Sequence, residues 1–100
     1  MSLKKYLSSD AKTVTITIDG MFDLSVQSDF RKAYEESRDV IKYVIDLRGA
    51  EYMDSSAFGM LLVFKDYVGG DKADISIINA SDDIKKSFSM LQFDRIFKVS

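Results

Sequence analysis

The chain has 100 residues, of which 46% are hydrophobic and 30% charged, and its net charge is −2. This length and composition predict one globular domain over residues 1–100 with a single core. The negative charge argues against nucleic-acid binding, which needs a basic surface. The sequence has no histidine and no cysteine, which excludes serine–histidine–aspartate triads, thiolate metal sites and cysteine nucleophiles.

The predicted compartment is the cytoplasm. No apolar run approaches the roughly 20 residues that a membrane-spanning helix needs, so we expect no membrane insertion. The first ten residues, MSLKKYLSSD, lack the apolar segment of a signal peptide. The absence of cysteine fits a reducing environment.

The first third of the chain predicts strands followed by a helix. Residues 13–18, TVTITI, alternate between polar and apolar side chains, which is typical of a strand with one buried face. A weaker strand is predicted at 3–8. Residues 26–37 carry apolar side chains at helical spacing, with Ser25 as the predicted N-cap.

The remainder alternates between strands and helices. Residues 42–47 and 74–78 predict buried strands, the first covered on both faces. A helix is predicted over 55–68, where a Gly-Gly pair ends it. Ser81 is predicted to cap a third helix, and RIFKVS at the C-terminus predicts a short edge strand. The apolar stripe of the third helix comprises Ile84, Phe88 and Leu91.

This order of elements predicts an α/β fold with a mixed, mostly parallel sheet of four to five strands and helices packed on it. In such folds, functional sites gather where strands end and helices begin. The segment EYMDSSAFGMLL, residues 51–62, lies at one such place.

Three polar residues, Asp54, Ser55 and Ser56, directly precede the apolar part of that helix. One interpretation is a helix cap, in which a side-chain oxygen accepts a hydrogen bond from a free backbone N–H and stabilises the helix by about 1 kcal/mol. A cap accounts for one of the three residues.

A second interpretation makes Ser55 a nucleophile, which would need a neighbouring base. Lys65 lies nearly three turns further along the same helix, and Lys72 lies beyond the helix end. We therefore expect no enzymatic activity and no catalytic residue. No set of residues converges as metal ligands, so we also expect neither a metal site nor a cofactor.

A third interpretation makes Asp46 the phosphoacceptor of a receiver domain, because it follows a buried strand. A receiver also needs an acidic pair after its first strand, and Asp19 stands there without a second acid beside it. The sequence therefore disfavours a receiver domain.

A fourth interpretation is phosphorylation of a serine by another protein. Phosphate carries a charge of about −1.5 to −2, which the free N–H groups and positive dipole of a helix N-terminus tolerate. Asp54 opposes that charge. We expect phosphorylation to change the surface of an intact fold and hence the docking of a partner.

The helix that follows has one buried and one exposed side at 3.6 residues per turn. The predicted buried side comprises Ala57, Met60, Leu61, Phe64 and Val68. The predicted outer side comprises Ser55, Gly59, Leu62 and Asp66, flanked by Ser56 and Val63. Two aliphatic side chains therefore face outward beside the serines, and the glycine would let a partner approach closely.

The segment IDLRGAEYMDSSAFGMLL resembles the signature of STAS domains, the bacterial anti-sigma-factor antagonists and their relatives. The matching residues are Asp46, Leu47, Asp54, Ser55, Ser56 and Gly59. DGMFDLSVQSDF is similar to the Gly-x-x-Asp turn of the family, with Gly20 and Asp23 in register, and MLQFDRIFKV resembles its closing helix and strand.

This resemblance implies a partner-switching protein without a cofactor of its own. A serine kinase, often the anti-sigma factor itself, phosphorylates the first serine, which is Ser55 here, and a cognate phosphatase reverses it. The phosphorylation state sets partner binding. The resemblance also places Asp23 near the phosphosite, while ATP and Mg²⁺ belong to the kinase.

The sequence departs from the family pattern where Ala57-Phe58 replaces Gly-Leu. Phe58 could reshape the core or the docking face, and we include it with Gly59, Leu62 and Val63 in the predicted partner surface. Ser56 is the alternative phosphosite. Two other functions stay open, namely a constitutive STAS adaptor subunit of a lipid-transport complex and a small-ligand-binding module.

Overall fold

A computed structural model of the chain describes residues 3–37 and 39–100. Its main sheet has five strands in the order β1-β2-β4-β6-β7. The strands are β1 (Leu3–Leu7), β2 (Thr13–Ile18), β4 (Lys42–Asp46), β6 (Ile75–Ile78) and β7 (Lys98–Val99). β1 runs antiparallel to β2 and the other pairs are parallel. The predicted mixed, mostly parallel sheet is therefore confirmed.

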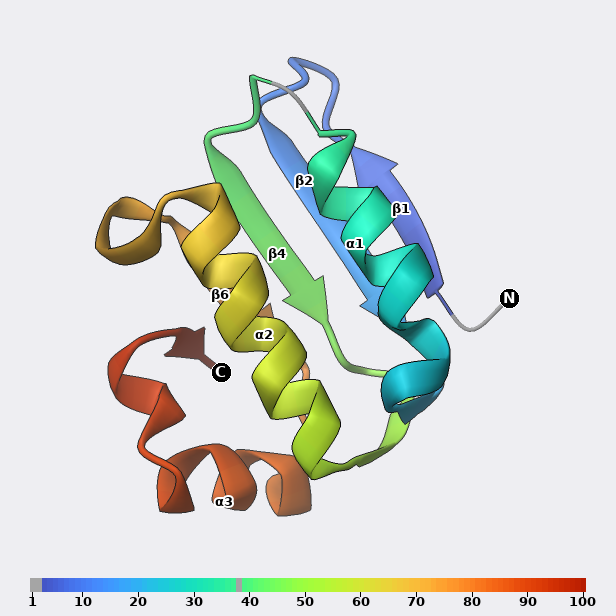
Figure 1. Cartoon of the computed structure of the whole chain (residues 1–100), viewed down its shortest axis with the longest axis vertical. Helices are drawn as coiled ribbons and strands as arrows, with labels where there is room; N and C mark the ends of the chain where they lie inside the picture. The colour runs from blue at the N-terminus through green and yellow to red at the C-terminus, as the bar shows by residue number, and fades with distance from the viewer. Residues whose placement is uncertain (1–2, 38) are drawn as a thin grey trace.

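Two helices, α1 (Gln27–Glu35) and α2 (Ser55–Val68), lie on the same face of this sheet (Figure 1). The third helix, α3 (Asp82–Met90), lies near the N-terminal end of α2. Three 3₁₀ turns complete the chain: η1 (Leu24–Val26), η2 (Gly70–Lys72) and η3 (Phe93–Arg95). None of the helices in the described ranges is long and apolar enough to span a membrane.

The central strands are buried on one face only, which corrects the prediction that 42–47 is covered on both faces. Tyr43 and Ile45 of β4 are buried, whereas Val44 between them is partly exposed. β6 alternates in the same way. The reason is that α1 and α2 share one face of the sheet and leave the other open.

The predicted bounds of α2, 55–68, match the structure. Asp54 is the N-cap, and its side chain accepts a hydrogen bond from the Ala57 amide. At the other end Gly69 has φ of 139°, a conformation that favours glycine and ends the helix.

The start of α1 differs from the prediction that Ser25 caps the helix. Asp23 caps the turn η1, and α1 follows at Gln27 without a side-chain cap. Ser25 lies inside η1, where its amide and hydroxyl both donate to the Asp23 carboxylate, and Val26 takes the N-cap position of α1.

The end of α3 also differs. Ser81 caps the helix as predicted, accepting from the Ile84 amide. Leu91 lies beyond the helix and is 53% exposed, so it does not belong to the buried stripe. The chain turns through Gln92, which has a left-handed φ of 60°, and Phe93 packs in its place against Phe88.

A small second sheet was not predicted. β3 (Gly20–Phe22) pairs in parallel with β5 (Ala50–Met53), with a register shift after Gly20. Strands of three and four residues are too short to show a period in sequence. This small sheet sets the positions of both predicted acidic site residues, because Asp23 and Asp54 each follow one of its strands.

Aromatic side chains fill the core on both sides of α2. Phe64 of α2 packs against Phe30, Tyr34 and Tyr43. Phe58 of α2 packs against Phe88 and Phe93 near the C-terminus. The central helix is therefore anchored to both halves of the chain.

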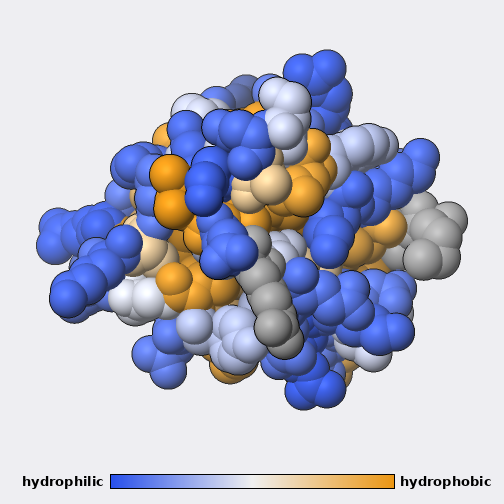
Figure 2. All heavy atoms as spheres, turned by 90° about the horizontal axis from the view of Figure 1, so that it is seen from above, coloured by the Kyte–Doolittle hydropathy of each residue, from blue (hydrophilic) through white to orange (hydrophobic). Residues whose placement is uncertain are grey.

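The C-terminal ends of β2 and β4 and the N-terminal end of α2 lie at the same end of the molecule. Seen from the opposite end, hydrophilic side chains form the rim and hydrophobic ones gather toward the middle (Figure 2). The candidate site lies at the end that carries the N-terminus of α2.

Candidate functional site

Asp23 and Asp54 follow the two paired strands of the small sheet and lie next to each other. Phe22 of β3 pairs with Met53 of β5, so the next residue of each strand is an aspartate. The Asp54 amide donates to the Phe22 carbonyl at 3.3 Å. Since neighbouring strands lie about 4.8 Å apart, the structure brings these two predicted site residues together.

Each aspartate caps the helical segment that follows it. Asp23 Oδ1 accepts from the Ser25 amide at 2.9 Å and from its hydroxyl. Asp54 Oδ1 accepts from the Ala57 amide at 3.2 Å and from the Ser56 hydroxyl at 2.5 Å. The hydrogen bond from the Ser25 hydroxyl is the largest cause that lowers the pKa of Asp23, and the hydrogen bond from the Ser25 amide is the second. Both carboxylates are therefore held as caps.

The two adjacent serines open onto different flanks of α2. Ser55 is exposed and lines a hollow between α2 and α3. Ser56 is half-buried and lines a hollow between α1 and α2. The difference matters because the Ser56 hydroxyl is engaged with Asp54, whereas Ser55 presents its side chain to solvent.

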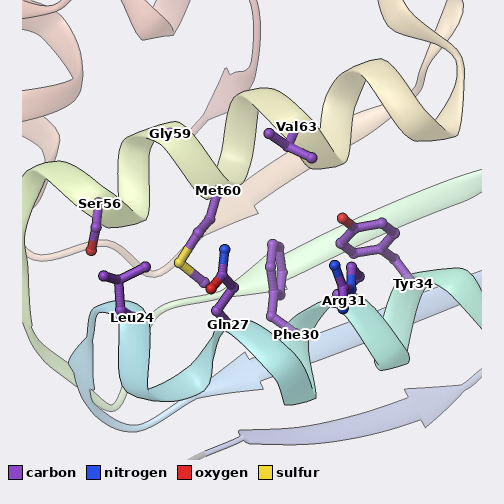
Figure 3. Close-up of a pocket in the computed structure, with 9 residues that line it drawn as sticks. All are labelled: Leu24, Gln27, Phe30, Arg31, Tyr34, Ser56, Gly59, Met60 and Val63. Carbon is purple, nitrogen blue, oxygen red and sulfur yellow. The ribbon is translucent and has the colours of Figure 1, made fainter.

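The α1–α2 hollow has a volume of about 280 Å³ and a largely apolar lining. Ser56 and Met60 of α2 point toward Leu24, Gln27 and Phe30 of the opposite segment (Figure 3). Val63, a predicted partner residue that is 62% exposed, lies at this flank as well.

The α2–α3 hollow is larger, about 480 Å³, and carries most of the exposed apolar surface near Ser55. Four large apolar side chains in its lining are exposed by 45–76%: Tyr52, Leu62, Met90 and Leu91. The sequence predicted only Leu62 among them. Met90 and Leu91 lie at and just beyond the end of α3, and Tyr52 lies in the four-residue strand β5, which is too short to show a period.

Phe58 differs from its predicted place in the partner surface. It is 8% exposed, and its ring packs edge-on against Phe88 and Phe93 at centroid distances of 5.3 and 5.2 Å. A side chain with so little exposed surface forms the floor of the hollow rather than a projecting contact.

Gly59 lies where the two hollows meet, because it lines both of them. A methyl group built at its Cα would meet no atom within 4 Å other than those of the adjacent residues and the backbone of its own helix. The glycine therefore leaves an open gap in the exposed side of α2, where a partner can approach the helix backbone.

The two lysines considered as bases for Ser55 lie at the other end of α2. Lys65 Nζ donates to the Gly70 carbonyl at 3.0 Å and lies 3.4 Å from Asp71 Oδ1. Lys72 belongs to η2. Since a helix of 14 residues is about 21 Å long, neither amine reaches the serine hydroxyl.

A family model described as Mlab, STAS domain matches residues 6–99. The chain belongs to the STAS domain family. It is 43% identical over the full length of both chains to a STAS-domain containing protein of Pseudomonas aeruginosa. The capping turn at Asp54 and the helix that follows are thus those of a STAS domain.

Solved structures show the same fold at low identity. An anti-sigma factor antagonist of Mycobacterium paratuberculosis matches with a TM-score of 0.79 and 14% identity, covering 98% of this chain and 85% of that one. The anti-sigma factor antagonist SpoIIAA matches in its unphosphorylated form, with a TM-score of 0.70, 18% identity, and 94% and 96% coverage. The phosphorylated form of SpoIIAA from Bacillus matches with a TM-score of 0.69, 17% identity, and 98% and 90% coverage.

Proposed function

We propose that this STAS domain is a phosphorylation-controlled binding switch of bacterial signalling that acts in the cytoplasm. A partner serine kinase with the role of an anti-sigma factor phosphorylates Ser55, a phosphatase removes the phosphate, and the phosphorylation state sets partner binding. The observation that carries this proposal is the exposed Ser55 side chain at the helix N-terminus, beside an apolar hollow. The existence of SpoIIAA in both forms supports it.

The chemistry belongs to the partner enzymes. The kinase transfers the γ-phosphoryl group of ATP to Ser55 Oγ, so that the bond to ADP breaks and the serine proton passes to a base of the kinase. The phosphatase hydrolyses the phosphoserine with water. This chain supplies a hydroxyl and a docking surface.

Ser55 is favoured over Ser56 as the acceptor because of their different surroundings. A kinase must expose and align the hydroxyl, and Ser56 Oγ would first have to break its hydrogen bond to Asp54. Phosphate on Ser55 sits at the free N–H groups of α2, which tolerate its charge. The fold should therefore survive the modification.

Phosphopeptide mapping of the protein from its own cells, in growth and under stress, tests the proposal. We expect phosphate on Ser55 in some conditions only, lost in Ser55→Ala and retained in Ser56→Ala. Phosphate on Ser56 instead would move the acceptor by one residue.

The alternative is a constitutive adaptor, for instance on a lipid-transport complex, because the apolar hollow is already exposed in the unmodified chain. Absence of phosphate in every condition, together with equal partner binding by Ser55→Ala and Ser55→Asp, would favour the adaptor over the switch.

A further inference from the structure

The outer flank of α2 carries a continuous groove. Leu62 lines both the α2–α3 hollow and a second hollow of about 460 Å³. The second hollow continues past Asp66 to Gly70, with Ile96 on its far side. We call the two together the outer groove, which runs along α2 from Ser55 to Gly70.

The groove is mainly apolar beside Ser55 and has both apolar and charged lining residues at its other end. Four exposed apolar side chains line the groove near Ser55, and Ile96, which is 42% exposed, lines its other end. Phe58 and Phe93 contribute further apolar surface beneath the rim. Contiguous exposed apolar surface of this kind is typical of an interaction site rather than of scattered surface residues.

The charges that line the groove are mainly acidic. Asp54, Asp66 and Asp71 line it, against a single cation, Lys65. That lysine is 13% exposed and is already held by the Gly70 carbonyl and Asp71. Asp54 is used as the helix cap. The charge available to a partner is therefore negative and concentrated at the end of the groove near Asp66.

α2 lines the whole groove, and the opposite wall is an α-helix only beside Ser55. α2 forms one wall, and α3 with the segment after it forms the other (Figure 1). A groove between helices accepts an amphipathic helix that presents residues at spacings of three and four. The 14 residues of α2 give a length of about 21 Å, which corresponds to an occupant of about four turns.

We propose that the outer groove binds a single amphipathic helix of a partner protein, with an aliphatic stripe along the groove and basic residues at the end that faces Asp66. The regulation of this binding rests on the proposed function. The apolar end of the partner helix faces Ser55. Phosphate there would have to lose water against an apolar surface, which is unfavourable. Phosphorylation therefore releases the helix by blocking one end of the groove.

The test uses synthetic 16-residue helical peptides and the full ¹⁵N-labelled chain. The probe peptide has a leucine stripe and lysines at one end. One control replaces the lysines with glutamates, and the other scrambles the leucines around the helix. We expect saturable amide shifts along α2 and α3 with the probe, and affinity at least about tenfold weaker for each control.

Two matched variants localise the binding. Leu62→Ser and Met90→Ser should weaken binding of the probe peptide about tenfold. Leu24→Ser should not, because Leu24, whose exposure of 61% lies between those of Leu62 and Met90, lines the α1–α2 hollow. Asp66→Lys should reverse the preference between the lysine and glutamate peptides. Equal effects of all three serine variants, shifts confined to α1, or no saturable binding would overturn the proposal.

Two further outcomes separate this inference from its premises. Shifts along α2 that grow with protein concentration in the absence of peptide would show a second copy as the occupant and overturn the proposal. Phosphoserine at position 55 should weaken the probe peptide about tenfold. Undiminished binding by the phosphorylated chain would contradict the release mechanism and the proposed switch, whereas loss of groove binding in the unmodified chain would contradict the groove alone.

Discussion

At the scale of single residues, Asp54 both caps α2 and holds the Ser56 hydroxyl. Asp54→Ala should lower the free energy of unfolding by about 1 kcal/mol, the usual effect of losing an N-cap. Asp54→Asn should keep most of the capping contribution, because asparagine is also a good N-cap residue. Urea denaturation measures both. Asp66→Ala on the exposed side of α2 is the control, for which we expect little change.

The same substitution tests the choice of acceptor. In Asp54→Ala the Ser56 hydroxyl no longer has its carboxylate partner, so phosphorylation by the cognate kinase should spread from Ser55 to Ser56. Phosphopeptide mapping measures the ratio. An unchanged ratio would show that the hydrogen bond to Asp54 does not protect Ser56.

At Gly59, the stability of the helix and the access of a partner to the helix backbone favour different residues. Because open space surrounds the position of a new methyl group, Gly59→Ala should stabilise the protein by up to about 1 kcal/mol through helix propensity. The methyl group would also occupy the gap between the two hollows and weaken partner binding. Thermal denaturation and partner titration of the same variant check the two effects, and a variant that is more stable but binds equally well would remove Gly59 from the interface.

At the scale of elements, α2 joins two aromatic clusters through Phe58 and Phe64. Phe58→Leu restores the residue usual in the family but loses the edge-on contacts with Phe88 and Phe93. We expect a loss of about 1–2 kcal/mol in the free energy of unfolding. Tyr52→Leu, at an exposed position, is the control with little expected change. Unchanged stability of Phe58→Leu would mean that leucine repacks the cluster.

Sequence patterns predicted the elements best where local chemistry sets both ends. α2 is bounded by a capping aspartate and by a glycine in a left-handed conformation, and both were visible in the sequence. Leu91 was misplaced because a single left-handed residue, Gln92, ends the periodicity of α3. β3 and β5 depend on tertiary pairing, which no short window shows.

The candidate site was predictable only in part for the same reason. Asp54, Ser55 and Ser56 form one local motif, whereas the neighbouring position of Asp23 depends on the pairing of β3 with β5. The outer groove combines residues from β5, α2 and α3. Packing between distant segments, rather than local pattern, decides which apolar residues stay exposed there.

At the scale of the whole molecule, the ionisable groups predict a broad plateau of stability with pH. Hydrogen bonds from a neighbouring serine or lysine lower the pKa values of Asp10, Asp23 and Asp74 below 3.8. Burial raises the pKa values of Tyr34 and Tyr43 above 10.0. No histidine or cysteine titrates between these limits.

The signs follow from proton linkage. A lowered aspartate pKa stabilises the fold above pH 3.8, and this contribution is lost as the pH falls further. A raised tyrosine pKa stabilises it below pH 10.0, and this contribution is lost as the pH rises. The free energy of unfolding from urea titrations should be nearly constant between about pH 5 and 9. A steep slope near neutral pH would contradict this assignment.

Lys98 provides the control for the acidic limb. It donates to Asp74 at 2.8 Å and is the main cause of the lowered pKa of that carboxyl. Lys98→Ala should therefore make the loss of stability below about pH 4 shallower and leave the neutral plateau unchanged in shape.

Neighbouring positions of a helix differ by about 100° in direction, so Ser55 and Ser56 share nearly the same flanking sequence but face different surroundings. A short unfolded peptide with the sequence EYMDSSAFGM would offer both hydroxyls on equal terms. Selectivity for one of them is thus a property of the folded chain. An enzyme that reads linear sequence would treat the pair as one target, whereas an enzyme that reads shape would distinguish two.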